Sequence, residues 1–226
     1  MKSTDDKNGY DKIIEQEELY EKSKVVKEAA AVYGAKKQGE YTIEDYYALP
    51  DDERVELIDG VFYNMSSPTS IHQIIGGKIY AKLDAFVMSK KGKCVPINSP
   101  IDVQLDCDDK TMVQPDVIII CNRDKFKKGI VFGAPEFVVE VLSPSTSTKD
   151  KTLKLSKYMS AGVQEYWIVD PKKKNIIVYF KDKEDDYDVY LYSFADEVPV
   201  RLFNSECAVN FKEIYEYIEF LYEKES

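Results

Sequence analysis

Two acidic residues lie within apolar runs of the sequence, where an ionised side chain is costly. Glu140 interrupts the run Phe-Val-Val-Glu-Val-Leu at residues 137–142, and Asp116 opens the run that continues to Ile120. Runs this short and this rich in β-branched residues predict strands that are buried on both faces. An ionised carboxylate in such a strand needs a metal ion or a cationic side chain to compensate its charge. We therefore expect the two acids, which are 24 residues apart, to form a divalent-metal site.

Each of the two acids also has an ordinary structural explanation. Asp116 could be a turn residue at the start of its strand, and Glu140 could take part in a structural salt bridge. The sequence leaves both explanations open.

The elements that must position these acids follow from hydrophobic periodicity and turn residues. Helices are expected at residues 43–48, 70–89, 149–161 and 211–223. Extended segments are expected at residues 55–63, around an Asp59-Gly60 turn, and at 94–97, 101–106, 115–121, 136–142, 165–170, 176–180 and 187–192. This order predicts an α/β or α+β fold in which helices flank a mixed β-sheet and extra hairpins are added.

The chain is expected to divide near residue 40. Residues 1–39 are rich in Glu and Lys, and residues 11–35 can form a helix that is either poorly anchored or an oligomerisation arm. We therefore predict an N-terminal helical extension over residues 1–39 and a single domain over residues 40–226.

The net charge of −10 argues against broad, nonspecific attraction to nucleic acid or anionic lipid. A local basic patch within an acidic molecule is still compatible with this charge. Only three of the 31 basic residues are arginine, so bidentate reading of guanine edges is hardly available. Phosphate contacts would therefore come mainly from lysines and backbone amides.

The four cysteines show neither a CxxC pair nor zinc-ligand spacing, and we expect them to be reduced. The N-terminus lacks the apolar segment of a signal peptide. No stretch approaches the roughly 20 apolar residues that a membrane span needs. Together these features predict a cytoplasmic protein.

A string of motifs between about residues 41 and 180 resembles one protein family. The string contains Glu56-Leu57-Ile58-Asp59-Gly60, His72, Pro115-Asp116-Val117, the stretch from Glu140 to Thr146, Asp150, Lys154, Tyr158, and the stretch from Gly162 to Asp170. It resembles the Uma2 (DUF820) family of restriction-endonuclease-like proteins. The resemblance implies the PD-(D/E)XK nuclease fold, a mixed sheet with one helix before the core strands and one between the last two.

The resemblance also implies an activity, which is hydrolysis of DNA phosphodiester bonds with a metal-activated water. The expected cofactor is Mg²⁺, or Mn²⁺ in its place. Magnesium takes oxygen ligands and keeps several waters, so two or three carboxylates suffice to bind it. Asp116 and Glu140 would be the central pair. Glu56, which matches the first residue of the family's ELIDG motif, would be the third ligand unless it is an ordinary exposed hairpin acid.

The position of the lysine departs from the general nuclease motif. In the D/E-X-K pattern the lysine lies two residues after the acid, and here that residue is Leu142. The family pattern places a lysine on the following helix, where Lys154 stands, with Lys151 as the fallback. Lys154 would orient the attacking water or stabilise charge on the phosphate. One side of this helix carries Asp150, Lys154, Lys157 and Tyr158, and it could also be a solvated charged face.

Four residues of the matching segments are expected to contact the substrate: Ser143, His72, Lys157 and Tyr158. Ser143 lies in a Ser- and Thr-rich link to the helix, where hydroxyls and amides hold a phosphate or simply cap the helix. His72, the only histidine, could contact the substrate or have a structural role.

We therefore expect a metal-dependent endonuclease, and the alternative is a catalytically inactive nuclease-fold module that binds nucleic acid or a protein partner. The last predicted helix carries more aromatic residues than one face can bury, namely Tyr215, Tyr217, Phe220 and Tyr222. This surplus predicts a homodimer, which would suit cutting of two strands by two-fold symmetry.

Overall fold

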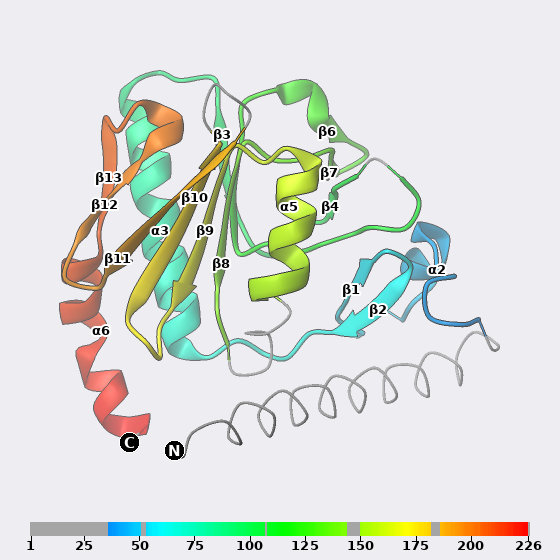
Figure 1. Cartoon of the computed structure of the whole chain (residues 1–226), viewed down its shortest axis with the longest axis horizontal. Helices are drawn as coiled ribbons and strands as arrows, with labels where there is room; N and C mark the ends of the chain where they lie inside the picture. Colours follow the sequence, from blue (N-terminus) through cyan, green and yellow to red (C-terminus); the bar gives the residue numbers. More distant parts are fainter. Residues whose placement is uncertain (1–35, 51–52, 107, 144–149, 182–185, 226) are drawn as a thin grey trace, which may run out of the picture. The chain divides into compact units, whose positions relative to one another are not determined.

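The computed structural model describes residues 36–50, 53–106, 108–143, 150–181 and 186–225 (Figure 1). The predicted helix at residues 11–35 lies outside this description, so the division of the chain near residue 40 stays a prediction. None of the helices within the described ranges combines the length and apolar character of a bilayer span. The chain forms two compact units, one reaching to Met65 and including Asp109–Met112, the other made of the remaining residues.

The first unit is built around a hairpin. It contains α2 (Ile43–Tyr47) and the antiparallel strands β1 (Val55–Ile58) and β2 (Val61–Asn64). The turn residues Asp59 and Gly60 have φ angles of 50° and 73°, which is the left-handed conformation that a two-residue turn requires. The predicted Asp59-Gly60 turn is therefore confirmed.

The second unit is built on a six-stranded sheet with the order β11-β10-β9-β8-β5-β3. The bounds of these strands are β3 Val95–Asn98, β5 Val117–Ile120, β8 Phe137–Val141, β9 Glu165–Asp170, β10 Asn175–Lys181 and β11 Tyr187–Ser193. Strands β8 and β9 are parallel, and the other neighbouring pairs are antiparallel. Parallel neighbours need a crossover connection. Here the crossover contains a π-helical turn (Asp150–Lys154) followed by α5 (Leu155–Ala161).

Helices lie on both faces of this sheet (Figure 1). On one face lies α3 (Ser70–Ser89), whose bounds match the prediction. Its apolar stripe and the sheet residues Val117, Val139 and Val141 belong to one buried core. Because side chains alternate along a strand, Glu140 points to the opposite face, where α5 lies.

The C-terminal part of the chain completes the core on the α3 side. It consists of β12 (Glu197–Val200), a 3-10 turn (Arg201–Phe203), β13 (Cys207–Asn210) and α6 (Phe211–Glu225). A separate three-stranded sheet contains β4 (Val103–Gln104), β6 (Phe126–Lys127) and β7 (Ile130–Phe132), and a 3-10 turn (Arg123–Lys125) precedes β6. The sequence did not indicate β6, β7, β12 or β13, which are two to four residues long. The predicted class, a mixed sheet flanked by helices with added hairpins, is confirmed.

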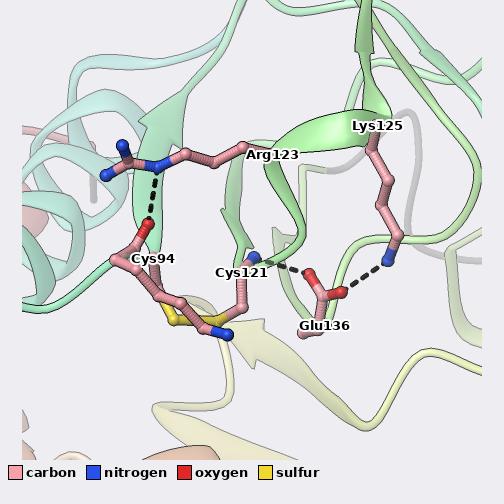
Figure 2. The surroundings of a disulfide bond; sticks show 6 residues. Cys94, Cys121, Arg123, Lys125 and Glu136 are labelled. Carbon is pink, nitrogen blue, oxygen red and sulfur yellow. Dashed lines mark hydrogen bonds and ion pairs between the residues drawn. A yellow bond between two sulfur atoms is a disulfide. The ribbon is translucent and has the colours of Figure 1, made fainter.

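Two of the cysteines form a disulfide, so the expectation that all four are reduced is wrong for this pair. The antiparallel register joins Val95 of β3 to Ile120 of β5, which sets Cys94 opposite Cys121 at the end of the two strands. Figure 2 shows the resulting Sγ–Sγ bond. The two residues are 27 positions apart, so only strand pairing reveals their proximity. Cys207 is a free, buried thiol.

A buried carboxylate joins the C-terminal part to the main sheet. Glu165, at the start of β9, is fully shielded from solvent. Its Oε1 accepts a hydrogen bond from Trp167 Nε1 and its Oε2 accepts one from the backbone N–H of Leu202, both at 2.7 Å. Burial raises the pKa of Glu165 to about 7, and these hydrogen bonds only partly offset the effect of burial.

Glu165 is therefore expected to make the folding stability depend on pH. The folded pKa exceeds the ordinary value of 4.5, so its contribution is full below about pH 4.5 and is lost as pH rises through about 7. The loss amounts to at most about 3 kcal/mol. Glu165→Gln removes this titration. Urea denaturation of both proteins between pH 5 and 8 should show wild type losing stability relative to the variant, and parallel pH profiles would contradict the expectation.

Candidate active site

Strand register places the two predicted acids opposite each other. Asp116 immediately precedes β5, and Glu140 lies in β8. The antiparallel pairing joins Val117 to Val139, so its continuation by one place sets Asp116 opposite Glu140. Opposed residues of antiparallel strands share one face, with Cβ atoms about 4.5–5.5 Å apart. The backbone N–H of Val141 also donates to Asp116 Oδ2 at 2.7 Å, which fixes the Asp116 carboxylate against β8.

Glu140 is held by two side chains of the following helical segment. Lys154 Nζ and the Tyr158 hydroxyl both donate to Glu140 Oε1, each at 2.7 Å. The side chains of Glu140 and Lys154 are only 5% and 4% exposed, and Tyr158 is fully buried. The ammonium group thus compensates the carboxylate in a setting where neither charge is solvated. The salt bridge that the sequence offered as an alternative explanation of Glu140 is present.

Asp116 has a second neighbour on the long helix. His72 lies in the first turn of α3, and its Nε2 is 3.2 Å from Asp116 Oδ2. The backbone N–H of His72 donates to the Thr69 hydroxyl at the helix N-cap, which fixes this first turn. Asp116, Glu140, His72, Lys154 and Tyr158 form what we call the acid cluster.

Three other predicted site residues lie differently. Lys157 forms an ion pair with Asp106 Oδ2. Ser143 follows β8 and is half-buried. Glu56 lies in β1 of the first compact unit, and its side chain is buried, unlike that of an ordinary hairpin acid. The roles expected of these three residues stay predictions.

Sequence reasoning missed two features of this arrangement. It did not predict that Tyr158 holds the carboxylate of Glu140, although the four-residue spacing from Lys154 places both side chains on the same side of the helix. It also did not single out Asp106, the partner of Lys157, because an acid at the end of a short extended segment gives no distinctive signal.

The oxygen donors of the acid cluster fit a divalent cation. Magnesium sites commonly use one or two carboxylates and leave the other positions to water and substrate phosphate. Asp116 and Glu140 supply two such carboxylates from opposed backbone positions. Within the described part of the chain, no three acidic, histidine or cysteine side chains are gathered in a way that could hold a metal ion. Asp116 and Glu140 are the carboxylates of the acid cluster, and two carboxylates suit a cation that keeps much of its water.

Comparison with known proteins concerns the family and the fold of this chain. The family described as "Uma2: Putative restriction endonuclease" matches residues 43–210. The chain is 27% identical over 159 residues to the uncharacterized protein slr1290 of Synechocystis sp., and the match covers 70% of this chain and 82% of the relative.

A solved structure is similar in fold. It is that of a "putative nuclease belonging to DUF820" from Anabaena variabilis ATCC 29413, and it matches with a TM-score of 0.64 at 19% sequence identity. The match covers 78% of this chain and 98% of the Anabaena protein. At this identity the likeness concerns the fold, and it includes nearly the whole of the solved chain.

Proposed function

Because the chain belongs to the Uma2 family, we propose that it is an endonuclease that hydrolyses DNA phosphodiester bonds with a divalent metal cofactor. The observation that carries the proposal is the pair of opposed carboxylates, Asp116 and Glu140, with Lys154 bonded to one of them. A purely structural salt bridge would need only one acid, and here a second acid faces the same side of the sheet.

Each residue of the acid cluster has a part in this proposal. A bound Mg²⁺ or Mn²⁺ would polarise a phosphoryl oxygen and make water a stronger nucleophile. Asp116 and Glu140 would hold the cation. The Val141 amide and His72 orient Asp116, whereas Tyr158 orients Glu140. Lys154 fixes Glu140 and brings a positive charge next to the phosphate that is cleaved.

The remaining predicted residues have supporting roles in this proposal. We propose Glu56 as a third ligand, and Ser143 and Lys157 as contacts for substrate phosphates. Lys157 can take this role only by leaving Asp106. The ion pair with Asp106 lies at a partly exposed surface, where such pairs contribute little to stability, so its loss costs little.

Asp116→Asn should abolish cation-dependent cleavage while leaving the fold intact. The amide removes a ligand charge, but its oxygen can still accept the Val141 hydrogen bond. We expect the cleavage rate to fall by more than the roughly 10- to 100-fold that is typical of outer-shell changes. The assay uses purified protein with Mg²⁺, Mn²⁺ or EDTA on single-stranded, nicked and duplex DNA.

The same assay separates the enzyme from a non-cutting module. If wild type and Asp116→Asn show equal trace cleavage, that cleavage is contamination, and the nuclease-fold binding module becomes the better explanation. Cleavage by wild type alone, lost in EDTA, supports the nuclease.

We also propose that the protein acts as a homodimer through α6. Tyr217 and Phe220 are 59% and 51% exposed on this helix, whereas Tyr215 and Tyr222 are half-buried and pack against each other. Light scattering at micromolar concentration should give the mass of two chains. Tyr217→Lys with Phe220→Lys should give the mass of one, and a monomeric wild type would contradict the proposal.

A further inference from the structure

A basic surface stands out on this acidic protein, and the acid cluster does not include it. Residues 90–94 and 121–128 contain seven basic residues and one acidic residue, although the whole chain carries a net charge of −10. Six of these basic side chains are exposed, and the five other than Lys90 are together called the basic patch: Lys91, Lys93, Arg123, Lys127 and Lys128.

Strand pairing and covalent bonding bring the two segments of the basic patch together. The Cys94–Cys121 disulfide joins them, and Arg123 Nε donates to the carbonyl of Lys93 at 3.0 Å. Figure 2 shows Arg123 reaching back beside Cys94. Lys128, with φ of 52°, lies in the turn between β6 and β7. Like charges gathered on a fixed surface repel one another, so their clustering indicates an anionic ligand.

The acids nearby leave the basic patch with a net positive charge, since Asp124 is the one acidic residue within its two segments. Glu136 accepts from Lys125 Nζ and from the backbone N–H of Cys121, and it is therefore engaged outside the patch (Figure 2). Glu206 is paired with Lys90. Lys125 and Lys90 are the two basic residues of these segments that we exclude from the patch for this reason.

An exposed aromatic residue belongs to the same stretch of sequence as these cations. Phe126, in β6 between Arg123 and Lys127 in sequence, is 38% exposed. Lysines that follow a phosphate backbone, together with an aromatic ring on which a base stacks, are the usual elements of single-strand binding. Groove reading of duplex DNA relies instead on arginine forks, and the basic patch has a single arginine.

We propose that the basic patch binds the sugar–phosphate backbone of a single-stranded nucleic acid, with Phe126 stacking on an unpaired base. This rests on the proposed nuclease function and adds a location and a strand preference to it. Asp116 and Cys121 lie at opposite ends of β5, roughly 17 Å apart at about 3.3 Å per residue. The patch would therefore hold the strand a few nucleotides from the acid cluster.

Charge reversal within the basic patch tests the proposal. The full chain is titrated in EDTA against a fluorescently labelled single-stranded oligonucleotide, and anisotropy is recorded over a range of salt concentrations. Lys93→Glu with Lys127→Glu should weaken binding by about tenfold or more. It should also reduce the slope of log affinity against log salt by about 1.4, since each lost phosphate contact on a single strand removes about 0.7.

The matched control makes the same change of charge elsewhere. Lys172 and Lys173 are exposed in the turn between β9 and β10, so Lys172→Glu with Lys173→Glu alters the net charge equally. The control should leave the salt slope unchanged. Phe126→Ala should weaken single-strand binding about tenfold and duplex binding less. Lys93→Gln with Lys127→Gln removes the two charges without reversing them, and it should cause at least half of the loss of affinity. This second variant tests the proposal even if the charge-reversed variant misfolds.

Three results would overturn the proposal. These are equal weakening by the patch and control variants, no binding by wild type, and equally effective competition by polyglutamate, which would indicate an acidic protein partner. Patch-dependent binding without any Mg²⁺-dependent cleavage would instead retain the basic patch and reject the proposed nuclease.

Discussion

Lys154→Met is expected to lower the free energy of unfolding by about 3–5 kcal/mol, because it leaves the Glu140 carboxylate buried without its countercharge. The methionine side chain nearly fills the space of the lysine, so loss of packing contributes little. Urea denaturation followed by the fluorescence of Trp167, the only tryptophan and a fully buried one, measures the change. Lys212→Met is the matched control. Its ammonium group is exposed and 3.9 Å from Glu216, so the change should stay within about 0.5 kcal/mol.

A double variant shows whether the charge pair itself is responsible. Glu140→Leu with Lys154→Met removes both charges and should recover much of the lost stability, because an apolar pair has no desolvation cost. Mg²⁺ should stabilise Lys154→Met more than wild type, since the cation replaces the missing countercharge at Asp116 and Glu140. Equal response of the two proteins to Mg²⁺ would count against a metal site at these acids, whatever the activity.

The second large effect is on the cleavage rate. Lys154→Met should reduce single-turnover cleavage by roughly 10²- to 10³-fold at saturating Mg²⁺, the range for loss of one group that stabilises transition-state charge. The cleavage rates should be measured without urea, at a temperature at which the variant is fully folded. Lys151→Met is the matched control on the same turn. A loss confined to Lys151→Met would transfer the role to that lysine, and no loss in either variant would remove lysine from the mechanism.

Tyr158→Phe distinguishes orientation of Glu140 from direct action of Lys154. The phenylalanine removes one of the two hydrogen bonds to Glu140 Oε1 and keeps the ammonium group. If Lys154 acted only by orienting Glu140, Tyr158→Phe would slow cleavage about as much as Lys154→Met. We expect a smaller loss, on the order of 10-fold, as is usual for a residue that supports a ligand.

The sequence predicts those parts of the fold that depend on local pattern. The stripe through Ile71, Ile75 and Ile79 repeats every four residues, and the helix has the predicted bounds. The Asp59-Gly60 turn follows from the two residues that most easily adopt positive φ angles. The buried strands around Asp116 and Glu140 follow from short runs of β-branched residues.

Features that depend on distant partners could not be predicted in this way. The strand β12 contains Pro199, a residue that argues against a strand until its partner β13 is known. The Cys94–Cys121 bond depends on the register of β3 against β5. The site shows the same division. The sequence identifies Asp116, Glu140 and Lys154 as candidate site residues. Only the structure shows that Lys154 and Tyr158 donate to the same oxygen, Glu140 Oε1.

The two edge strands of the main sheet differ in how readily a strand of another copy of the chain could pair with them. At one edge, β3 has four residues, contains Pro96 with no N–H to donate, and is tied to β5 by the disulfide. At the other edge, β11 has seven residues, and Val189 and Leu191 are 54% and 76% exposed. Among the described strands none pairs with the outer side of β11. A filament needs two open edges on every copy, so the short, proline-containing edge at β3 disfavours growth beyond two chains paired through β11.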